Sequence, residues 1–374
     1  MLALIQGQVE TVDASAPEAL RLTVRTECGV RHAIAYTELI GPVLAGDRVL
    51  LNTWAVELAL GTGGTDFVVS VDRPVRRAEP PGHIMKLRYT PLQVPVAAVE
   101  APESPHHSAM RRFATLSAMP VVCAELHSQI PAIAAAAKWQ TDGDARIAYI
   151  MTDGAALPAA LSRLIPRMRE RGLIDCCITA GQAFGGDLEA VNIYSALAAA
   201  QTVAKCDIAI VGQGPGNAGT ETPLGFSGMD QAIALNAASG LDATPIAAVR
   251  LSFADPRPRH VGLSHHTGTV LSCGTLCPAL VPIPRLSSPE DASLRRRLSS
   301  MGILHRHEVI TVHAEPALEA LLATGIEVTT MGRGIQEERA FFLAAGAAGL
   351  VAGQWLEGID LNNEATRTEA APFP

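Results

Sequence analysis

The sequence contains almost no lysine. Of its 29 basic residues only three are lysines, at positions 86, 138 and 205. The 37 acidic residues give a formal net charge of −8, which disfavours non-specific binding to nucleic acid, so we expect no nucleic-acid partner. Because arginine supplies nearly all of the positive charge, we expect an anion bound by a side chain to be held by a guanidinium group, which can donate two parallel hydrogen bonds.

Long apolar runs and a secretion signal are also lacking. No apolar run reaches the roughly 20 residues that a membrane span requires. The first residues, MLALIQGQVETVD, have neither a basic start nor a long apolar segment, so they do not match a signal peptide. These features predict a cytoplasmic protein without a membrane partner.

The cysteines and the glycine-rich segments exclude two further classes of site. The seven cysteines include no CxxC pair, a pattern that fits neither a disulfide framework nor a zinc knuckle. The sequence has no GxxxxGK[ST] segment, the phosphate-binding loop of many nucleotide-triphosphate sites. It identifies no cofactor and no particular metal ion.

The length and composition predict two domains with large cores. The chain has 374 residues, of which 48% are hydrophobic, more than one ordinary core requires. Residues 1–75 read as a small antiparallel β domain, with short strands at 21–25, 30–36, 49–52 and 67–71 and no helix-length apolar period. A small antiparallel barrel or a sandwich is the natural way to close such strands, and we expect a barrel-like domain. Residues 76–118, which begin with a segment rich in proline and charge, are predicted to be a linker and a connecting strand.

Strands alternate with helices from residue 119 to residue 356. The expected strands are residues 121–124, 146–151, 174–180, 207–211, 245–251, 279–283, 308–312 and 327–330. Apolar stripes predict helices at 157–168, at 188–197 with Asp187 as the N-cap, and from Ser227 to about Ala238 with Asp230 completing a capping box. This alternation predicts a Rossmann-like, mainly parallel, doubly wound α/β domain. Residues 357–374 form a polar tail.

The segment DIAIVGQGPGNAGTET, residues 207–222, combines an apolar strand with a loop that holds several glycines. It formally matches GxGxxG, but Pro215 has no amide hydrogen and the next helix starts only near Ser227, so a dinucleotide site is disfavoured. A small polar or anionic metabolite held by the loop amides is one interpretation and a tight turn is the other. We expect Gly214 and Gly216 to require glycine for backbone reasons, and their replacement to harm ligand binding more than folding.

Polar side chains follow several of the expected parallel strands, and the carboxyl ends of such strands meet at one edge, where α/β proteins bind ligands. Glu125 and His127 would share a face if their strand continued. They can act as general acid and base, or join Asp153 and a later histidine in a mixed metal site, although the spacing matches no specific metal signature. The catalytic candidates are Glu125, His127, Asp153, His265 and His266, and the binding candidates are Gln213, Gly214, Gly216, Asn217 and Arg333.

Five segments together resemble a family of uncharacterised bacterial proteins of about this length. They are GHIMKLRYTP, GGDLEAVN, QGPGNAGT, SHHTGT and MGRG. The resemblance implies a bacterial origin and a shared site, but it supplies no reaction. The sequence therefore favours an enzyme acting on a small polar or anionic metabolite. A non-catalytic metabolite-binding or regulatory protein and an assembly scaffold remain as alternatives, and a homo-oligomer is left open.

Overall fold

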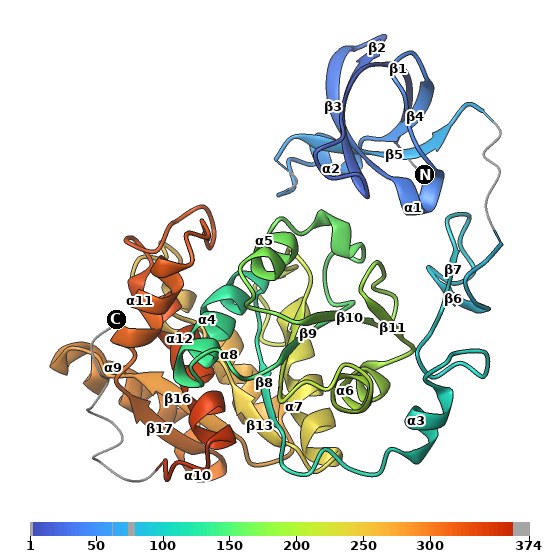
Figure 1. Cartoon of the computed structure of the whole chain (residues 1–374). Helices are drawn as coiled ribbons and strands as arrows, with labels where there is room; N and C mark the ends of the chain where they lie inside the picture. Colours follow the sequence, from blue (N-terminus) through green and yellow to red (C-terminus); the bar gives the residue numbers. More distant parts are fainter. Residues whose placement is uncertain (1–2, 62, 74–78, 362–374) are drawn as a thin grey trace. The chain divides into compact units, whose positions relative to one another are not determined.

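The computed structural model describes residues 3–61, 63–73 and 79–361. The chain divides into two compact units, Met1–Ala97 and Ala98–Pro374 (Figure 1). Residues 74–78 of the predicted linker and residues 362–374 of the predicted polar tail lie outside the described residues. Each unit is described by itself.

The first unit contains a closed five-stranded barrel with the strand order β1-β2-β3-β5-β4. Its strands are β1 (Leu4–Asp13), β2 (Ala19–Thr26), β3 (Gly29–Tyr36), β4 (Arg48–Asn52) and β5 (Thr65–Val71). Alternate residues of β2, such as Leu22 and Val24, are buried inside the barrel. The barrel prediction is confirmed, but the barrel is not wholly antiparallel, because β3 and β5 pair in parallel. The sequence pattern also did not identify β1. Among the described residues before 75, the helices α1 (Thr37–Ile40) and α2 (Trp54–Glu57) have four residues each. A hairpin of β6 (Ile84–Lys86) and β7 (Val94–Val96) follows.

The second unit is built on an eight-stranded sheet in which all neighbouring strands are parallel. In sheet order the strands are β11 (Leu188–Ala190), β10 (Cys176–Ala180), β9 (Ile147–Thr152), β12 (Ile208–Gln213), β8 (Pro120–Cys123), β13 (Thr244–Ala247), β16 (Leu280–Pro284) and β17 (Glu308–Val312). The inner strands β8, β9, β10 and β12 are buried along their whole length, because such strands are covered on both faces. The edge strand β17 begins with the exposed Glu308. The predicted Rossmann-like α/β fold is confirmed.

Helices cover both faces of this sheet (Figure 1). Along β8, Val122 joins one hydrophobic core while Val121 and Cys123 join the other, because successive side chains of a strand point to opposite faces. The first core contains α4 (Ile130–Gln140), α5 (Leu164–Glu170), α11 (Glu315–Ala323) and α12 (Arg339–Leu356). The second contains α6 (Ile193–Thr202), α7 (Asp230–Gly240), α9 (Ser288–Ser300) and α10 (Ile303–Arg306), and α3 (His107–Arg112) packs against α6.

Three local predictions are corrected by the structure. Residues 188–190 form the edge strand β11, and helix α6 begins only at Ile193, because the Asn192 side chain caps it by accepting from the amides of Tyr194 and Ser195. Asp187 accepts instead from the amide of Cys177. The helix expected at 157–168 begins as α5 at Leu164. No strand forms at residues 327–330 in the described chain, where Thr330 closes a turn with Arg333.

Helix α12 is an apolar helix of 18 residues, shorter than the run of roughly 20 residues that was taken to mark a membrane span. By length and composition it could cross a membrane, but 72% of it is buried inside the protein, as expected for a core helix. It packs closely on α4, and a Cβ atom added at Gly349 would overlap the carbonyl oxygen of Ile133. The missing side chain is therefore what lets the two helices approach each other.

Replacing Gly349 by alanine tests this packing. Alanine in a helix interior is normally more favourable than glycine by about 1 kcal/mol. Here the added methyl group has no room, so we expect the free energy of unfolding to fall by about 1–3 kcal/mol, measured by urea unfolding. The control is Gly240→Ala in α7, where the new Cβ would meet Tyr194 at 4.0 Å, an ordinary contact. Equal stability of the two variants would show that α4 and α12 are not closely packed at this point.

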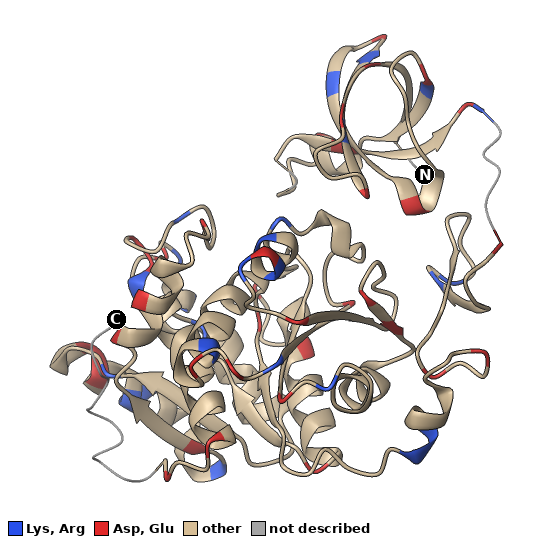
Figure 2. Ribbon diagram, viewed as in Figure 1, with Lys and Arg blue, Asp and Glu red and all other residues tan. Residues whose placement is uncertain are grey.

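Charged residues of both signs are interspersed along the ribbon of each unit (Figure 2). Several pair locally in the second unit: Lys138 and Arg146 both contact Asp175, and Arg295 contacts Asp291. Exposed pairs of this kind contribute at most about 1 kcal/mol each. The two apolar cores, rather than surface ion pairs, are therefore the main source of stability.

Candidate functional site

Neighbouring connections diverge at the carboxyl end of β8, where an open α/β sheet is expected to form its ligand crevice. The chain leaves β8 toward α4 on one face of the sheet, whereas β12, on one side of β8, leads to α7 on the opposite face. On the other side of β8, the chain runs from β13 to α8 (His265–Thr269). Val270 and Leu271, directly after α8, belong to the same core as α7. Ligands of open α/β sheets bind at such points, where neighbouring connections diverge. Glu125 follows the end of β8 by two positions and therefore lies at this expected crevice.

Glu125 is the centre of the hydrogen-bond network in the crevice. Its Oε1 atom accepts from Nδ1 of His266 at 2.5 Å, from Nη1 of Arg250 at 3.1 Å and from Nδ2 of Asn217 at 3.3 Å. Its backbone carbonyl accepts from Nε2 of Gln213 at 3.0 Å. The residue is only 1% exposed, yet Oε2 is buried and has no hydrogen-bond partner in the described part of the chain. Residues from four separate segments thus meet at one carboxylate that keeps a free oxygen.

The charges around Glu125 favour its ionised form. Burial alone raises the pKa of the carboxyl, but the hydrogen bond from His266 and the positive charge of Arg250 outweigh burial and lower it below its usual range. Arg250 is itself buried and also lies 3.6 Å from Asp255. A hydrogen bond from Arg257 is the main reason why the pKa of Asp255 is lowered. The crevice therefore holds an ionised carboxylate beside a buried guanidinium.

Arg333, predicted to bind a ligand, is linked to this network at one remove. It contacts Glu338 at 2.5 Å and Asp255 at 3.5 Å. Glu338 also accepts from the hydroxyl of Ser252 at 3.0 Å. A chain of ion pairs therefore connects Arg333 to Glu125 through Asp255 and Arg250.

His127 does not lie beside the Glu125 carboxylate on a common strand face. Strand β8 ends at Cys123, because the Gln129 side chain accepts from the amides of Glu125 and Leu126 and starts a 3₁₀ turn at His127. The imidazole is buried, with Nδ1 bonded to the Tyr149 hydroxyl at 3.0 Å and Nε2 to Ser162 at 2.7 Å. Burial lowers its pKa to about 4. Both ring nitrogens are used inside the protein, which gives His127 a structural role.

Asp153 follows β9 and lies across β12 from the Glu125 network. It is exposed, and its Oδ2 atom accepts from the amide of Gln182 at 2.8 Å. Asp230 of α7 interacts electrostatically with Asp153 and is hydrogen-bonded to Thr152. Burial and the charge of Asp153 raise the pKa of Asp230 despite that hydrogen bond. Glu125 and Asp153 thus follow strands that lie on either side of β12 at the same edge of the sheet.

The two glycines singled out in the loop after β12 have local structural reasons. A Cβ atom at Gly214 would overlap the carbonyl oxygen of Ala156, and Gly216 has a φ of +102°, which L-residues rarely adopt. Alanine is therefore strained at Gly216 rather than compatible with its backbone. Asn217, the exposed residue directly after Gly216, donates a hydrogen bond to Glu125.

Three histidines gather on the other side of Glu125. His260 ends a 3₁₀ turn, and His265 and His266 begin α8. The His266 ring stacks on Phe226, with centroids 3.8 Å apart. Burial, together with the nearby charges of Arg250, Arg257 and His266, lowers the pKa of His260 to about 3, and burial lowers that of His265. His260 and Arg250 were not among the predicted site residues, although the three histidines lie within seven positions of one another in the sequence.

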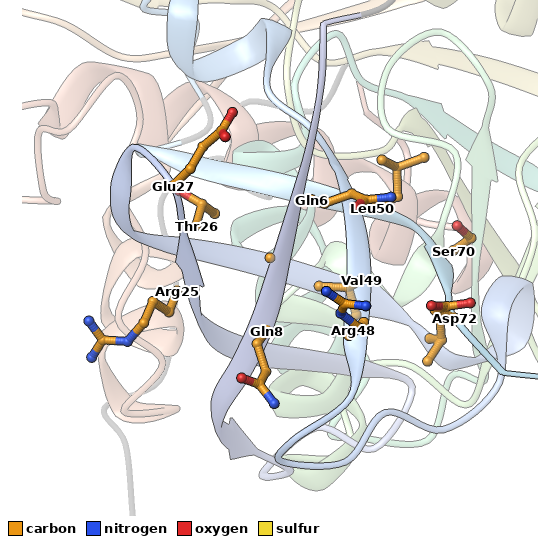
Figure 3. A pocket seen from close by; sticks show the side chains of 12 residues that line it. Gln6, Gln8, Arg25, Thr26, Glu27, Arg48, Val49, Leu50, Ser70 and Asp72 are labelled. Atoms are coloured by element: carbon orange, nitrogen blue, oxygen red, sulfur yellow. The ribbon is translucent and has the colours of Figure 1, made fainter.

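A polar hollow of about 470 Å³ lies in the first unit, whereas every predicted site residue belongs to the second. It is formed by neighbouring strands of the barrel, and Figure 3 shows Gln8 of β1, Arg48 of β4 and Asp72 beside one another in it. The lining residues come in groups of three from β1, β4 and the ends of β2 and β5, which are separated in the sequence. A motif search along the sequence therefore had no signal with which to find this hollow.

Comparison with known proteins gives one match. Residues 32–349 match the model of a family described as a protein of unknown function (DUF3866). No curated protein matches the chain. The match covers most of the chain, and it confirms the resemblance to an uncharacterised family.

Proposed function

Since the chain belongs to the DUF3866 family of proteins of unknown function, we propose from its geometry that it binds a small polar or anionic metabolite at the crevice beside β8. We further propose that it is an enzyme using acid/base or metal-assisted chemistry. A bacterial, cytoplasmic setting belongs to the same proposal and is supported by the resemblance of its motifs.

One observation carries this proposal. Glu125 is held rigidly by three hydrogen bonds to Oε1, while Oε2 is buried and has no partner among the described residues. A buried acceptor left without a donor costs about 1–3 kcal/mol, and a ligand that supplies the donor would remove this cost. A hydroxyl, amide or ammonium group of a metabolite is such a donor. In an enzyme the same oxygen can then take the donated proton, as a general base does.

The surroundings of Glu125 support a ligand that enters from solvent. Asn217, which contacts Glu125, is exposed, whereas Arg250 and His266, which contact the same oxygen, are buried. The carboxylate is thus fixed by buried groups and approached through exposed ones, the arrangement expected of a pre-organised binding site. A non-catalytic metabolite-binding or regulatory protein would use the same crevice without turnover.

The experiment compares the wild type with Glu125→Gln, which keeps the shape of the side chain but cannot accept a proton. Native mass spectrometry of the freshly purified protein detects co-purified metabolites, and a library of amino acids, polyols and small carboxylates is screened for thermal stabilisation and turnover. We expect the substitution to weaken binding at least 10-fold and to abolish turnover. The matched control is Glu100→Gln, a partly buried carboxylate that accepts from the amide of Val191 near edge strand β11.

The outcomes separate the candidate functions. Binding and turnover that depend on Glu125 but not on Glu100 support the enzyme. Binding that depends on Glu125 without turnover of any bound compound supports the regulatory alternative. If Glu125→Gln and Glu100→Gln retain metabolites equally, the metabolites do not bind at Glu125 and the proposed site is wrong.

A further inference from the structure

His260, His265 and His266 form a compact cluster of possible metal ligands. One ring nitrogen from each residue can be chosen so that the three atoms lie within 4.8 Å of one another. The ring centroids are 5.1 Å apart for His260 and His265, 4.9 Å for His260 and His266, and 4.4 Å for His265 and His266. Imidazole nitrogen is a preferred ligand of Zn²⁺ and of neighbouring transition metals.

Hydrogen bonds fix two of the three rings through the same nitrogen. Nδ1 of His266 bonds to Oε1 of Glu125 at 2.5 Å, and Nδ1 of His260 bonds to the hydroxyl of Ser264 at 2.8 Å. Metal-binding histidines usually donate the ring N–H opposite the metal to a carboxylate or another oxygen, which fixes both tautomer and orientation. With Nδ1 used in this way, each ring directs Nε2 away from its hydrogen-bond partner and leaves it for a metal ion.

The third histidine has a buried nitrogen that the fold does not satisfy. Nε2 of His265 is inaccessible to solvent and has no hydrogen-bond partner within the described ranges. Stacking on Phe226 explains why aromatic rings gather here, since His266 lies flat against that ring. Stacking leaves this nitrogen without a partner, whereas a metal ion would supply one.

We propose that His260, His265 and His266 bind a divalent transition metal of the zinc class, with a coordination position left open toward the Glu125 crevice. Three histidines and one open position are the ligand set of many catalytic zinc sites. Glu125 is a positioning residue in this site, because it orients His266 rather than binding the ion. The role of this metal as a cofactor rests on the proposed function. Metal binding itself does not, and it can be measured without a substrate.

The geometry sets two requirements on the site. Tetrahedral coordination with Zn–N distances of 2.0–2.1 Å places the nitrogens about 3.3 Å apart, so the rings must close from separations of up to 4.8 Å. Arg250 lies 3.4 Å from Nδ1 of His266 and repels a cation. The carboxylates of Glu125 and Asp255, both in contact with Arg250, offset that repulsion.

The test measures metal binding by the full-length protein, produced without a histidine tag and stripped with a chelator. Zn²⁺ is added in competition with a chromophoric chelator, and Co²⁺ serves as a spectroscopic probe of tetrahedral coordination. We expect one ion per chain and three nitrogen ligands at about 2.0–2.1 Å by X-ray absorption. His265→Ala, at a partly exposed position that the fold tolerates, should lower Zn²⁺ affinity at least 100-fold. Glu125→Gln keeps all three ligands and should lower it about 10–100-fold.

The control is His313→Ala, which removes an exposed histidine outside the cluster. Circular dichroism of the metal-free proteins verifies that every variant is folded. The inference is overturned if the wild type binds no stoichiometric Zn²⁺, or if His265→Ala and His313→Ala bind it with the same affinity. If Zn²⁺ binds as expected while metabolite binding is indifferent to Glu125→Gln, the metal site stands and the proposed function fails.

Discussion

Replacing Arg250 by methionine is expected to lower the free energy of unfolding by about 3–5 kcal/mol. The guanidinium is 4% exposed and contacts two carboxylates that are equally buried, Glu125 at 3.1 Å and Asp255 at 3.6 Å. Methionine fills much of the volume but leaves Glu125 buried without its cation. The cost comes mainly from that uncompensated charge, which urea unfolding at neutral pH measures.

Two further variants separate the charge from the loss of packing. Arg257→Met removes another arginine from Asp255, but its side chain is 34% exposed, so we expect a loss of about 1 kcal/mol. The double variant Glu125→Gln/Arg250→Met removes both buried charges, and we expect it to be more stable than Arg250→Met alone. If the double variant is instead the less stable of the two, Arg250 stabilises the fold by packing rather than by neutralising Glu125.

Acidification is expected to destabilise the protein through His127 by about 3 kcal/mol. Burial holds the pKa of this imidazole at about 4, against 6.5 for an ordinary histidine. The unfolded chain therefore binds a proton that the folded protein excludes between these values, so stability falls as the pH decreases from 6.5 to 4. The difference of about 2.5 pKa units corresponds to about 3 kcal/mol at 1.36 kcal/mol per unit.

His127→Gln tests this prediction, because glutamine can form hydrogen bonds but does not titrate in this range. The stability difference between pH 7 and pH 4 should shrink by about 2–3 kcal/mol relative to the wild type. Tyr149→Phe is the matched control, since it removes a hydrogen bond to the imidazole and retains the titrating group. A pH profile of His127→Gln that parallels the wild type would show that His127 is not the group responsible.

The fold could be predicted largely from local patterns. Parallel strands covered on both faces are apolar throughout, which made most strands of the sheet readable, including residues 308–312, where prediction and β17 coincide. The predictions were wrong where a side-chain hydrogen bond sets the first or last residue of a helix or strand. The Asn192 cap moves the start of α6, and the Gln129 side chain ends β8 before His127. A hydrophobic pattern does not contain these hydrogen bonds.

The candidate site could be predicted only in part, because its residues come from distant segments. Glu125, Gln213, Asn217 and His266 follow strands or begin a helix at one edge, so topology alone brought them together. Arg250 contacts Glu125 across 125 positions of sequence, and its pairing depends on where the chain turns after β13. Asp153 shares the edge but lies across β12. The sequence pattern thus predicted that these residues lie at one edge of the sheet. Which of them are neighbours depends on the order of the strands, which the pattern does not contain.

The central claim is that the free oxygen of Glu125 receives a donor from a bound ligand. A crystal structure of the full-length protein with the library compound that most raises its melting temperature tests this most directly. The account predicts density in the crevice between Asn217 and β8, with a polar group within about 3 Å of Oε2 of Glu125. Density for the compound in the polar hollow of the barrel instead, with Oε2 bonded to a group of the protein itself, would contradict it.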